Sequence, residues 1–287
     1  MAGRVCIVTG ASSGIGKETT RGLARLGATV ILAVRNVSRG EAVAREIAQG
    51  TGNRELSVEA VDLARLASVR GFVADFTARH ANLHVLVNNA GIYTARRVLT
   101  EDGVESTFAS NHLGHFLLTN LLLDALRAGA PSRIVNVSSE AHQMGKIRFD
   151  DLTLERNWSG MAAYCQSKLA NVLFTAELAQ RLAGQGVIAN AVHPGAVRTN
   201  WGRHGAGAMG VGVRLAAPFL ISAAKGADTV VWLASAAEAD SVSGKYFYKR
   251  KPMEPNPLAG DPEVARRLWA VSERLVGLRA SVRAIPS

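Results

Sequence analysis

Cysteine is scarce in this chain: Cys6 and Cys165 are the only two in 287 residues. Two cysteines that lie far apart in the sequence cannot form a disulfide framework, and no set of cysteine and histidine residues has the spacing of zinc ligands. The sequence therefore predicts a protein of a reducing compartment that holds no metal ion.

Targeting segments and long apolar runs are also missing. The chain leads from Met1 through the apolar run Val5–Val8 into a glycine-rich loop, without the basic, apolar and cleavage regions of a signal peptide. The longest uncharged stretch, Ser106–Leu123, carries asparagine, histidine, threonine and serine, which suits a buried helix better than a membrane span. We expect a soluble, cytoplasmic protein with no membrane span.

Acidic side chains are fewer than basic ones, 23 against 33, which gives a net charge of +10. The arginines are scattered and do not form one basic stripe, so the charge predicts no nucleic-acid partner. A ligand that carries phosphate would account for a local part of it. The apolar fraction of 48%, with 20% charged residues, indicates a packed globular core and excludes a disordered chain.

Short β-rich runs alternate with helical patterns along most of the chain, which is typical of a parallel sheet covered on both faces. The spacing predicts a doubly wound α/β fold with about seven parallel strands: Val5–Thr9, Thr29–Val34, Leu56–Asp62, Val85–Asn88, Arg133–Ser138, Val187–His193 and Lys245–Tyr248. The predicted helices are Gly14–Leu26, Ser38–Gln49, Leu66–Arg79, Glu101–Ala128, Ala162–Ala183, Lys225–Ala234 and Pro262–Val276. Ligands of such sheets bind beyond the carboxyl ends of the strands.

No repeat or low-complexity linker divides the chain, so residues 1–287 are expected to form one dinucleotide-binding and catalytic domain. Two segments interrupt the alternation, Glu140–Gly160 and Asn200–Gly212. The second is rich in glycine, which favours a lid at about residues 200–218. An irregular surface loop without a role is the alternative.

A glycine loop, TGxxxGxG, follows the first predicted strand directly and leads into a helical pattern. Its glycines would let the backbone approach a pyrophosphate, and the helix would direct its free N–H groups at it. The residues expected to contact this ligand are Gly10, Ser12, Ser13, Gly14, Ile15 and Gly16. An ordinary turn between strand and helix is the alternative.

The end of the second predicted strand favours NADP over NAD. An acidic residue there would bind the ribose 2′-hydroxyl of NAD, but this chain has Val34 followed by Arg35. A guanidinium can bind the 2′-phosphate of NADP(H), although Arg35 could also be merely exposed. Asp62 and Leu63, which end the third strand, are expected beside the adenine, unless Asp62 only caps the next helix.

Tyr164 and Lys168 lie four residues apart in a helical pattern and so share one face. An ammonium about 4 Å from a phenol, at an effective dielectric constant of about 20, favours the phenolate by roughly 4 kcal/mol. The pair could therefore lower the pKa of the tyrosine into the range of a general acid or base. Taken alone, such a pair on a solvated helix face is common.

The combination of motifs is more specific than any one of them. Along the chain, the glycine loop is followed by Asn88–Gly91, Ser138–Ser139, the Tyr164/Lys168 pair and Pro194–Gly195. In this order they resemble the short-chain dehydrogenase/reductase family, in its single-domain branch with a Rossmann fold. The resemblance extends from Val5 to about Leu275.

The resemblance implies a role for each matching residue. Tyr164 would donate the proton to the carbonyl oxygen, and Ser139 would hydrogen-bond that oxygen. Lys168 would lower the pKa of Tyr164 and hold the nicotinamide ribose, and Asn111 would support a water-linked proton path to Lys168. The other implied cofactor contacts are Asn89, Ala90 and Gly91 beside the adenosine ribose, and Pro194, Gly195, Val197 and Thr199 at the nicotinamide.

Residues 134–142, 164–174 and 244–247 look especially similar to the retinol dehydrogenase and WW-domain oxidoreductase branch. We therefore expect NADPH-dependent reduction of a ketone or aldehyde, reversible as alcohol oxidation. Met144, Trp158 and Trp201 flank the matched positions and, with Met161 and Met209, predict a bulky hydrophobic small molecule, such as one tailored in secondary metabolism. Each could instead pack in the core or the lid. His142 either assists the site or is a hydrogen-bonded packing residue.

Other functions and assembly states remain open. A catalytically silent dinucleotide-binding regulator or scaffold is the main alternative, and a sugar-nucleotide epimerase is disfavoured by the loop spacing and the chain length. The family resemblance implies a homodimer or homotetramer. However, Leu169, Val172, Leu173 and Ala176 could equally be buried within one subunit.

Overall fold

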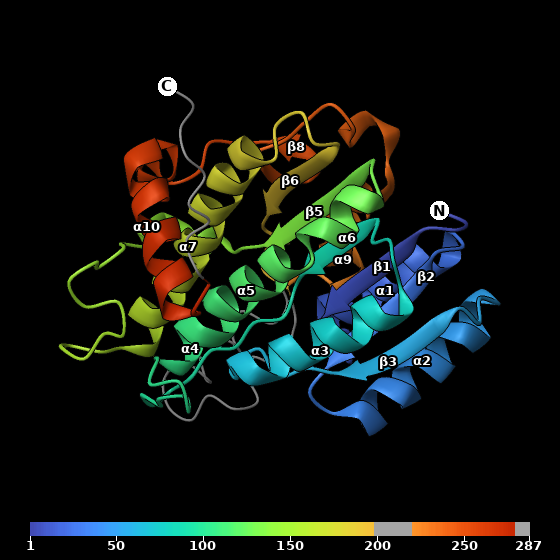
Figure 1. The fold of residues 1–287 in the computed structure, drawn as a ribbon, viewed down its shortest axis with the longest axis horizontal. Helices are drawn as coiled ribbons and strands as arrows, with labels where there is room; N and C mark the ends of the chain where they lie inside the picture. Colours follow the sequence, from blue (N-terminus) through green and yellow to red (C-terminus); the bar gives the residue numbers. More distant parts are fainter. Residues whose placement is uncertain (198–219, 279–287) are drawn as a thin grey trace.

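One sheet of eight strands runs through the protein (Figure 1). The computed structural model describes residues 1–197 and 220–278. The strand order is β3-β2-β1-β4-β5-β6-β7-β8, and the order reverses between β1 and β4, where ligands of such sheets bind. The strands are β1 (Val5–Thr9), β2 (Thr29–Val34), β3 (Leu56–Ala60), β4 (Val85–Asn88), β5 (Ser132–Val137), β6 (Val187–Val192), β7 (Tyr246–Tyr248) and β8 (Lys251–Pro252). The first seven are parallel, as the sequence predicts.

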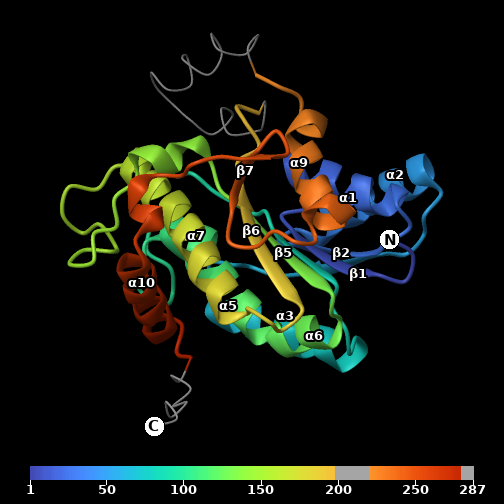
Figure 2. The same cartoon turned by 90° about the horizontal axis from the view of Figure 1, so that it is seen from above.

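Helices cover both faces of the sheet, which confirms the doubly wound fold (Figure 2). Successive strand residues point to opposite faces, so that Val8 packs in one apolar layer and Ile7 in the other. The first layer is covered by α1 (Gly14–Arg25), α2 (Val37–Thr51) and α9 (Ala223–Ser235). The second is covered by α3 (Leu66–Arg79), α5 (Gly114–Leu121), α6 (Leu123–Ala128) and α7 (Gly160–Arg181).

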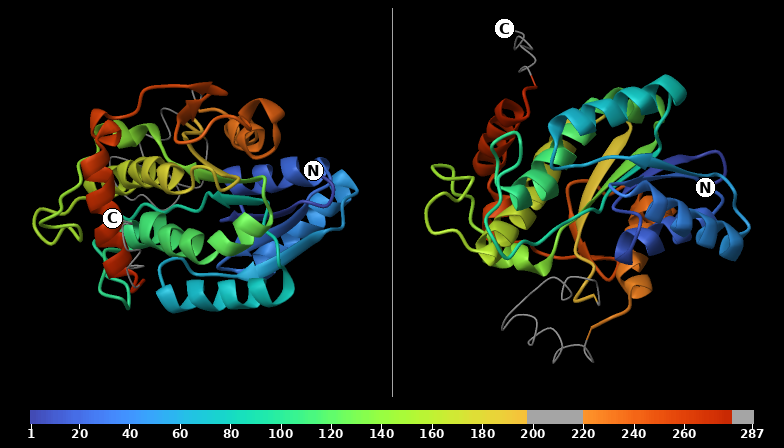
Figure 3. Two further views of the ribbon diagram at one scale, coloured as in Figure 1. Left: turned by 45° about the horizontal axis from the view of Figure 1, so that its top comes forward. Right: turned by 90° about the horizontal axis from the view of Figure 1, so that it is seen from below.

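A last helix, α10 (Pro262–Leu275), packs outside α7 (Figure 3). Its Trp269 ring lies 4.8 Å from Phe116 and 5.7 Å from Phe174, between ring centroids. Residues 169, 172 and 173 of α7 are thus buried within a single chain. The expected homo-oligomer therefore rests on the family resemblance and stays a prediction.

The predicted helix Glu101–Ala128 is wrong as a single element. The helical segment begins at Ser106, where the Glu105 side chain accepts a hydrogen bond from the Phe108 amide. It continues as α4 (Ser106–Phe108), a π-helical turn (Ala109–Leu113), α5 and α6. The π turn contains Asn111, whose side chain bonds to the Ile92 backbone, and such tertiary contacts leave no periodic pattern in the sequence.

The sequence also failed to predict β8, which pairs antiparallel with β7 through a two-residue turn. That turn consists of Lys249 and Arg250, with φ angles of 48° and 60°. Such left-handed turn positions usually carry asparagine, aspartate or glycine, so the sequence shows no hairpin signal there. Among the described residues, no helix combines the length and apolarity that crossing a bilayer requires.

Two buried histidines of the helical layer predict a steep loss of stability in mild acid. Burial lowers the pKa of His112 to about 3 and that of His115 to about 4. Both are neutral in the folded state near pH 5, whereas the unfolded chain protonates them below about pH 6.5. The unfolded state therefore binds more protons, and the two histidines should lower the free energy of unfolding by about 2.5 kcal/mol between pH 6 and pH 5.

Urea unfolding at closely spaced pH values measures this slope. His112→Phe should reduce it by about 1.2 kcal/mol per pH unit, since one titrating group is removed. An unchanged slope would mean that His112 is protonated in the folded protein.

Candidate active site

The glycine loop forms a cradle between β1 and α1. Gly10 and Gly14 have φ angles of 66° and 55°, which glycine adopts without strain. The N-cap of α1, Ser13, makes no side-chain capping hydrogen bond, so no capping side chain occupies the amides of the first turn. A Cβ on Gly16 would lie 2.5 Å from the Gly10 carbonyl oxygen and from Asn89 Nδ2. This compact cradle, with open amides at a helix N-terminus, fits the pyrophosphate of a dinucleotide.

A second turn closes the cradle from β4. Thr9 Oγ1 accepts hydrogen bonds from the amides of Asn89 (2.9 Å) and Ala90 (3.0 Å), and Asn89 Nδ2 donates to the Thr9 carbonyl (2.8 Å). His115 Nδ1 faces the Asn111 carbonyl oxygen (3.0 Å), which can only accept, so Nδ1 carries the proton. The unprotonated Nε2 then accepts from Thr9 Oγ1 at 2.9 Å.

Two arginines border the end of the cleft beyond β2. Arg35 and Arg39 both line it, and the Asn36 side chain caps α2 by accepting from the Arg39 amide at 2.8 Å. Asp62 and Leu63 line the same end. The Asp62 carboxylate also accepts from the Ala64 amide at 3.0 Å, so it stabilises the turn after β3 as well as bordering the cleft.

The predicted catalytic residues meet at the other end of the cleft. Tyr164 and Lys168 come from α7, and Ser139 lies two residues beyond the end of β5. All three line the cleft, and Ser139 and Tyr164 share a side-chain hydrogen bond. Asn111 lies behind them and is fully buried. Its amide group accepts from the Ile92 amide at 2.7 Å and donates to Ser167 Oγ at 3.0 Å.

The prediction that Lys168 lowers the pKa of Tyr164 is wrong for these side chains by themselves. Burial raises the pKa of the Tyr164 phenol, and the hydrogen bond with Ser139 offsets this only in part. Lys168 Nζ lies 5.7 Å from the centre of the phenol ring and donates to the Val137 carbonyl at 3.0 Å. Burial also lowers the pKa of the Lys168 ammonium to about 8. Loss of hydration on burial is thus the main cause of both shifts.

The remaining predicted contacts divide into three groups. Pro194, Gly195 and Val197 line the cleft beyond β6. Met144 and Trp158 do not belong to the lining; Met144 is 67% exposed. Thr199, Trp201, Met209 and the lid at 200–218 lie outside the described residues.

The cleft, of about 680 Å³, also contains residues that the sequence did not single out: Asn36, Arg39, Ile92, Tyr93, Ser110, Ala196 and Leu220. Tyr93 meets the Tyr164 ring edge-on, with 6.3 Å between centroids. A Cβ on Gly160 would lie 2.9 Å from the Tyr93 hydroxyl, so Gly160 leaves room for this ring. The sequence signal that could have identified Tyr93 as a cleft residue is its position two residues beyond the Asn89–Gly91 turn.

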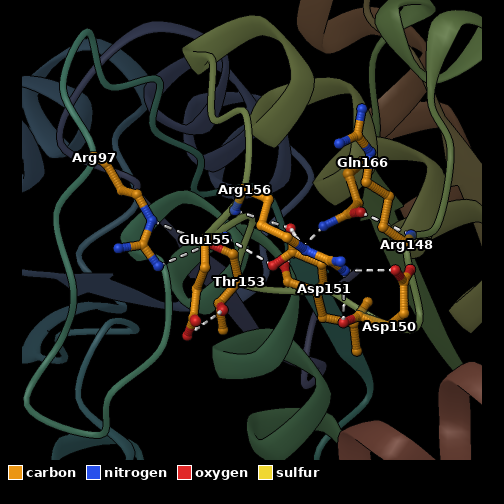
Figure 4. A network of polar contacts seen from close by, with 9 residues as sticks. Arg97, Arg148, Asp150, Asp151, Thr153, Glu155, Arg156 and Gln166 are labelled. Atoms are coloured by element: carbon orange, nitrogen blue, oxygen red, sulfur yellow. Dashed lines mark hydrogen bonds and ion pairs between the residues drawn. The ribbon is translucent and has the colours of Figure 1, made fainter.

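Residues 145–159 belong to the irregular segment Glu140–Gly160 and form a network of polar contacts ahead of α7 (Figure 4). Gln166 of α7 accepts from the Arg148 amide at 3.0 Å and donates to the Leu152 carbonyl at 2.9 Å. The Asp151 carboxylate accepts from the amides of Glu155 (2.7 Å) and Arg156 (3.1 Å). Gln166 follows Tyr164 by two residues, so the segment is held to the helix that carries the phenol.

Comparison with known proteins agrees with this geometry. The family model for short chain dehydrogenase matches residues 4–205. Human retinol dehydrogenase 13 is 50% identical over 291 residues, covering 99% of this chain and 88% of that protein. An uncharacterised protein from Mycobacterium paratuberculosis superposes with a TM-score of 0.79 at 40% identity, covering 96% and 94% of the two chains.

A more distant structure, the NADP complex of Pseudomonas aeruginosa RhlG, has a TM-score of 0.70 at 26% identity, covering 86% of this chain and 94% of that one. The fold, the order of the motifs and the identity over almost the whole chain agree. The chain belongs to the short-chain dehydrogenase family, in its retinol dehydrogenase branch.

Proposed function

We propose that this protein is an NADP(H)-dependent reductase of ketones or aldehydes carried on bulky hydrophobic small molecules, and that it oxidises the corresponding alcohols in reverse. Its family membership makes it an oxidoreductase of alcohols and carbonyl compounds that uses a nicotinamide dinucleotide. One observation carries the finer proposal: the Ser139–Tyr164 hydrogen bond lies in the same cleft as the glycine loop, with buried Lys168 beside it.

In this proposal most residues of the cleft bind the cofactor. The loop at Gly10–Gly16, the turn at Asn89–Gly91 and Pro194–Val197 hold the dinucleotide, and Arg35 and Arg39 face its 2′-phosphate. When bound, NADPH supplies the hydride. The structure of the relative RhlG is a complex with NADP, which supports NADP(H) as the cofactor of this protein.

Side chains of the protein supply the proton donor and orient the substrate oxygen. Tyr164 is protonated at neutral pH, and its phenol is the proton donor to the carbonyl oxygen in this proposal. Ser139 donates a hydrogen bond to the same oxygen and orients it. Asn111 holds the Ile92 backbone and Ser167 in place behind Lys168. Tyr93 offers apolar surface beside the phenol, and Leu220 lines the same cleft, which supports a hydrophobic substrate.

The proposal also includes the location, the domain organisation and the physiological role of the protein. We place the protein in the cytoplasm as a single domain, with a tailoring step in secondary metabolism as the physiological context. Because its relatives include retinol dehydrogenase 13, retinoids are among the hydrophobic carbonyl compounds to be tested.

Loss of reduced-nicotinamide absorbance with a panel of bulky ketones and aldehydes, retinal included, tests the proposal. We expect turnover with NADPH on at least one hydrophobic member and none on small polar carbonyls. NADPH binding without turnover on the whole panel would instead support the scaffold function.

A further inference from the structure

Ser139 is held from behind by a turn of its own chain. It caps the 3₁₀ helix η2 (Glu140–Met144), and its Oγ accepts from the Ala141 amide at 3.2 Å. The Ser139 carbonyl oxygen accepts from the His142 amide at 3.0 Å, and His142 Nδ1 lies 2.8 Å from the same oxygen. Both the main chain and the hydroxyl of Ser139 are thus tied to this turn.

The turn itself is fastened to a segment more than 100 residues later in the chain. The Asn256 amide donates to His142 Nε2 at 3.1 Å. Asn256 Nδ2 lies 3.2 Å from the His142 carbonyl oxygen and 2.9 Å from that of Gln143. Asn256 precedes the 3₁₀ helix η6 (Pro257–Gly260) and is 6% exposed, and His142 is fully buried.

These contacts determine which nitrogen of His142 carries the proton. A backbone amide only donates, so Nε2 must accept from Asn256 and carries no hydrogen. A carbonyl oxygen only accepts, so Nδ1 must carry the hydrogen and donate to Ser139. A neutral imidazole satisfies both partners at once, and burial lowers the pKa of His142, which keeps it neutral.

Packing leaves the imidazole little freedom to adopt another orientation. The Tyr246 ring of β7 lies 4.5 Å from the His142 ring, between centroids, and Tyr246 is itself 3% exposed. His193, which follows β6 directly, stacks on the Tyr246 ring at 5.7 Å between centroids. A shift of His142 toward this ring would therefore have to displace Tyr246 of β7.

We propose that His142 and Asn256 are positioning residues that hold Ser139 in hydrogen-bond reach of Tyr164 and of the substrate oxygen. The inference rests on the proposed function, since it assigns these residues to the reaction at Ser139. Residues 254–260 then belong to the active-site framework although they do not line the cleft. A small displacement of a group that orients a reacting atom can reduce the rate of a reaction by orders of magnitude.

The test compares kcat for His142→Phe in two backgrounds. The phenyl ring keeps the packing against Tyr246 and removes the hydrogen bonds to Ser139 and Asn256. It also removes the 3.3 Å contact between Nδ1 and the Tyr246 hydroxyl. With Ser139 present we expect kcat to fall about 10- to 100-fold, with the dissociation constant for NADPH unchanged. With Ser139→Ala, measured in single turnovers, the same substitution should change the rate less than about twofold, because its effect acts through Ser139.

Two further variants separate positioning from general destabilisation. His142→Gln places an amide oxygen near the Nε2 position, where it can accept from the Asn256 amide, and should restore part of kcat. His84→Phe is the matched control. It removes a histidine that accepts a hydrogen bond from the Val5 amide at 3.0 Å, at the amino-terminal ends of β1 and β4 and therefore away from the cleft. It should lower the melting temperature and leave kcat unchanged.

Each outcome is decisive. An unchanged kcat in His142→Phe, or an equal loss in both backgrounds, overturns the positioning role while leaving the proposed function standing. Absence of wild-type turnover on the whole carbonyl panel overturns the proposed function instead. Nitrogen NMR of histidine-labelled protein tests the hydrogen bonds of His142 without turnover. A proton on Nδ1 of His142 supports the positioning role, and a proton on Nε2 overturns it.

Discussion

Tyr164→Phe should reduce carbonyl turnover by at least about a thousandfold while NADPH still binds with nearly wild-type affinity. A positioned general acid typically contributes 10²- to 10⁴-fold, and a phenyl ring has no proton to donate. Phenylalanine keeps the edge-on contact with Tyr93, so the shape of the cleft changes little. Binding energy from the glycine loop and the arginines is remote from the phenol and should persist.

Steady-state kcat at saturating NADPH measures the first effect, and a fluorescence titration of NADPH the second. Loss of the hydroxyl leaves Ser139 without one partner, so a decrease in stability of about 1 kcal/mol should accompany it. A kcat within tenfold of the wild type would mean that another group supplies the proton. Loss of NADPH binding would mean that the residue is structural.

Arg35→Asp should weaken NADPH binding by at least about a hundredfold and leave NADH binding within about fivefold of its original value. A charge-assisted hydrogen bond to phosphate contributes roughly 1.5–3 kcal/mol, and a carboxylate adds repulsion of the 2′-phosphate. The same carboxylate can accept from the 2′-hydroxyl of NADH, as acidic residues do at this position in NAD-binding folds. The ratio of the two dissociation constants is therefore the informative quantity.

Arg45→Asp is the matched control for this change. Arg45 lies on α2 outside the cleft lining and is exposed, so the same change in charge should leave the ratio unaltered. Arg39→Ala should produce a smaller shift than Arg35→Asp, because it removes one positive charge without adding a negative one. An unaltered ratio in Arg35→Asp would refute the assignment of NADP specificity to this arginine.

Much of the site could be predicted because its motifs are local. The glycine spacing of the loop and the i, i+4 relation of Tyr164 and Lys168 are properties of a few consecutive residues. Parallel strands then bring their carboxyl ends to one edge of the sheet, so residues 139, 164 and 195 meet in one cleft. The order of strands and helices was sufficient to predict this.

Other features depend on partners distant in the sequence. The π turn at Asn111 follows its pairing with Ile92, and the orientation of Ser139 follows Asn256, which lies 117 residues away. The turn at Lys249 and Arg250 has no hairpin motif, since pairing of β8 with β7 imposes its backbone. Periodicity reports local geometry only, so such contacts could not be predicted.

The sequence by itself determined the doubly wound fold, the glycine-loop cradle and the set of side chains that we propose to react, because each depends on spacing along the chain. Only the tertiary structure decided the protonation of the site. Burial raises the pKa of Tyr164 and lowers that of Lys168. Hydrogen bonds from distant residues place the proton of His142 on Nδ1. Loss of hydration depends on every neighbouring element, and no local pattern of residues encodes it.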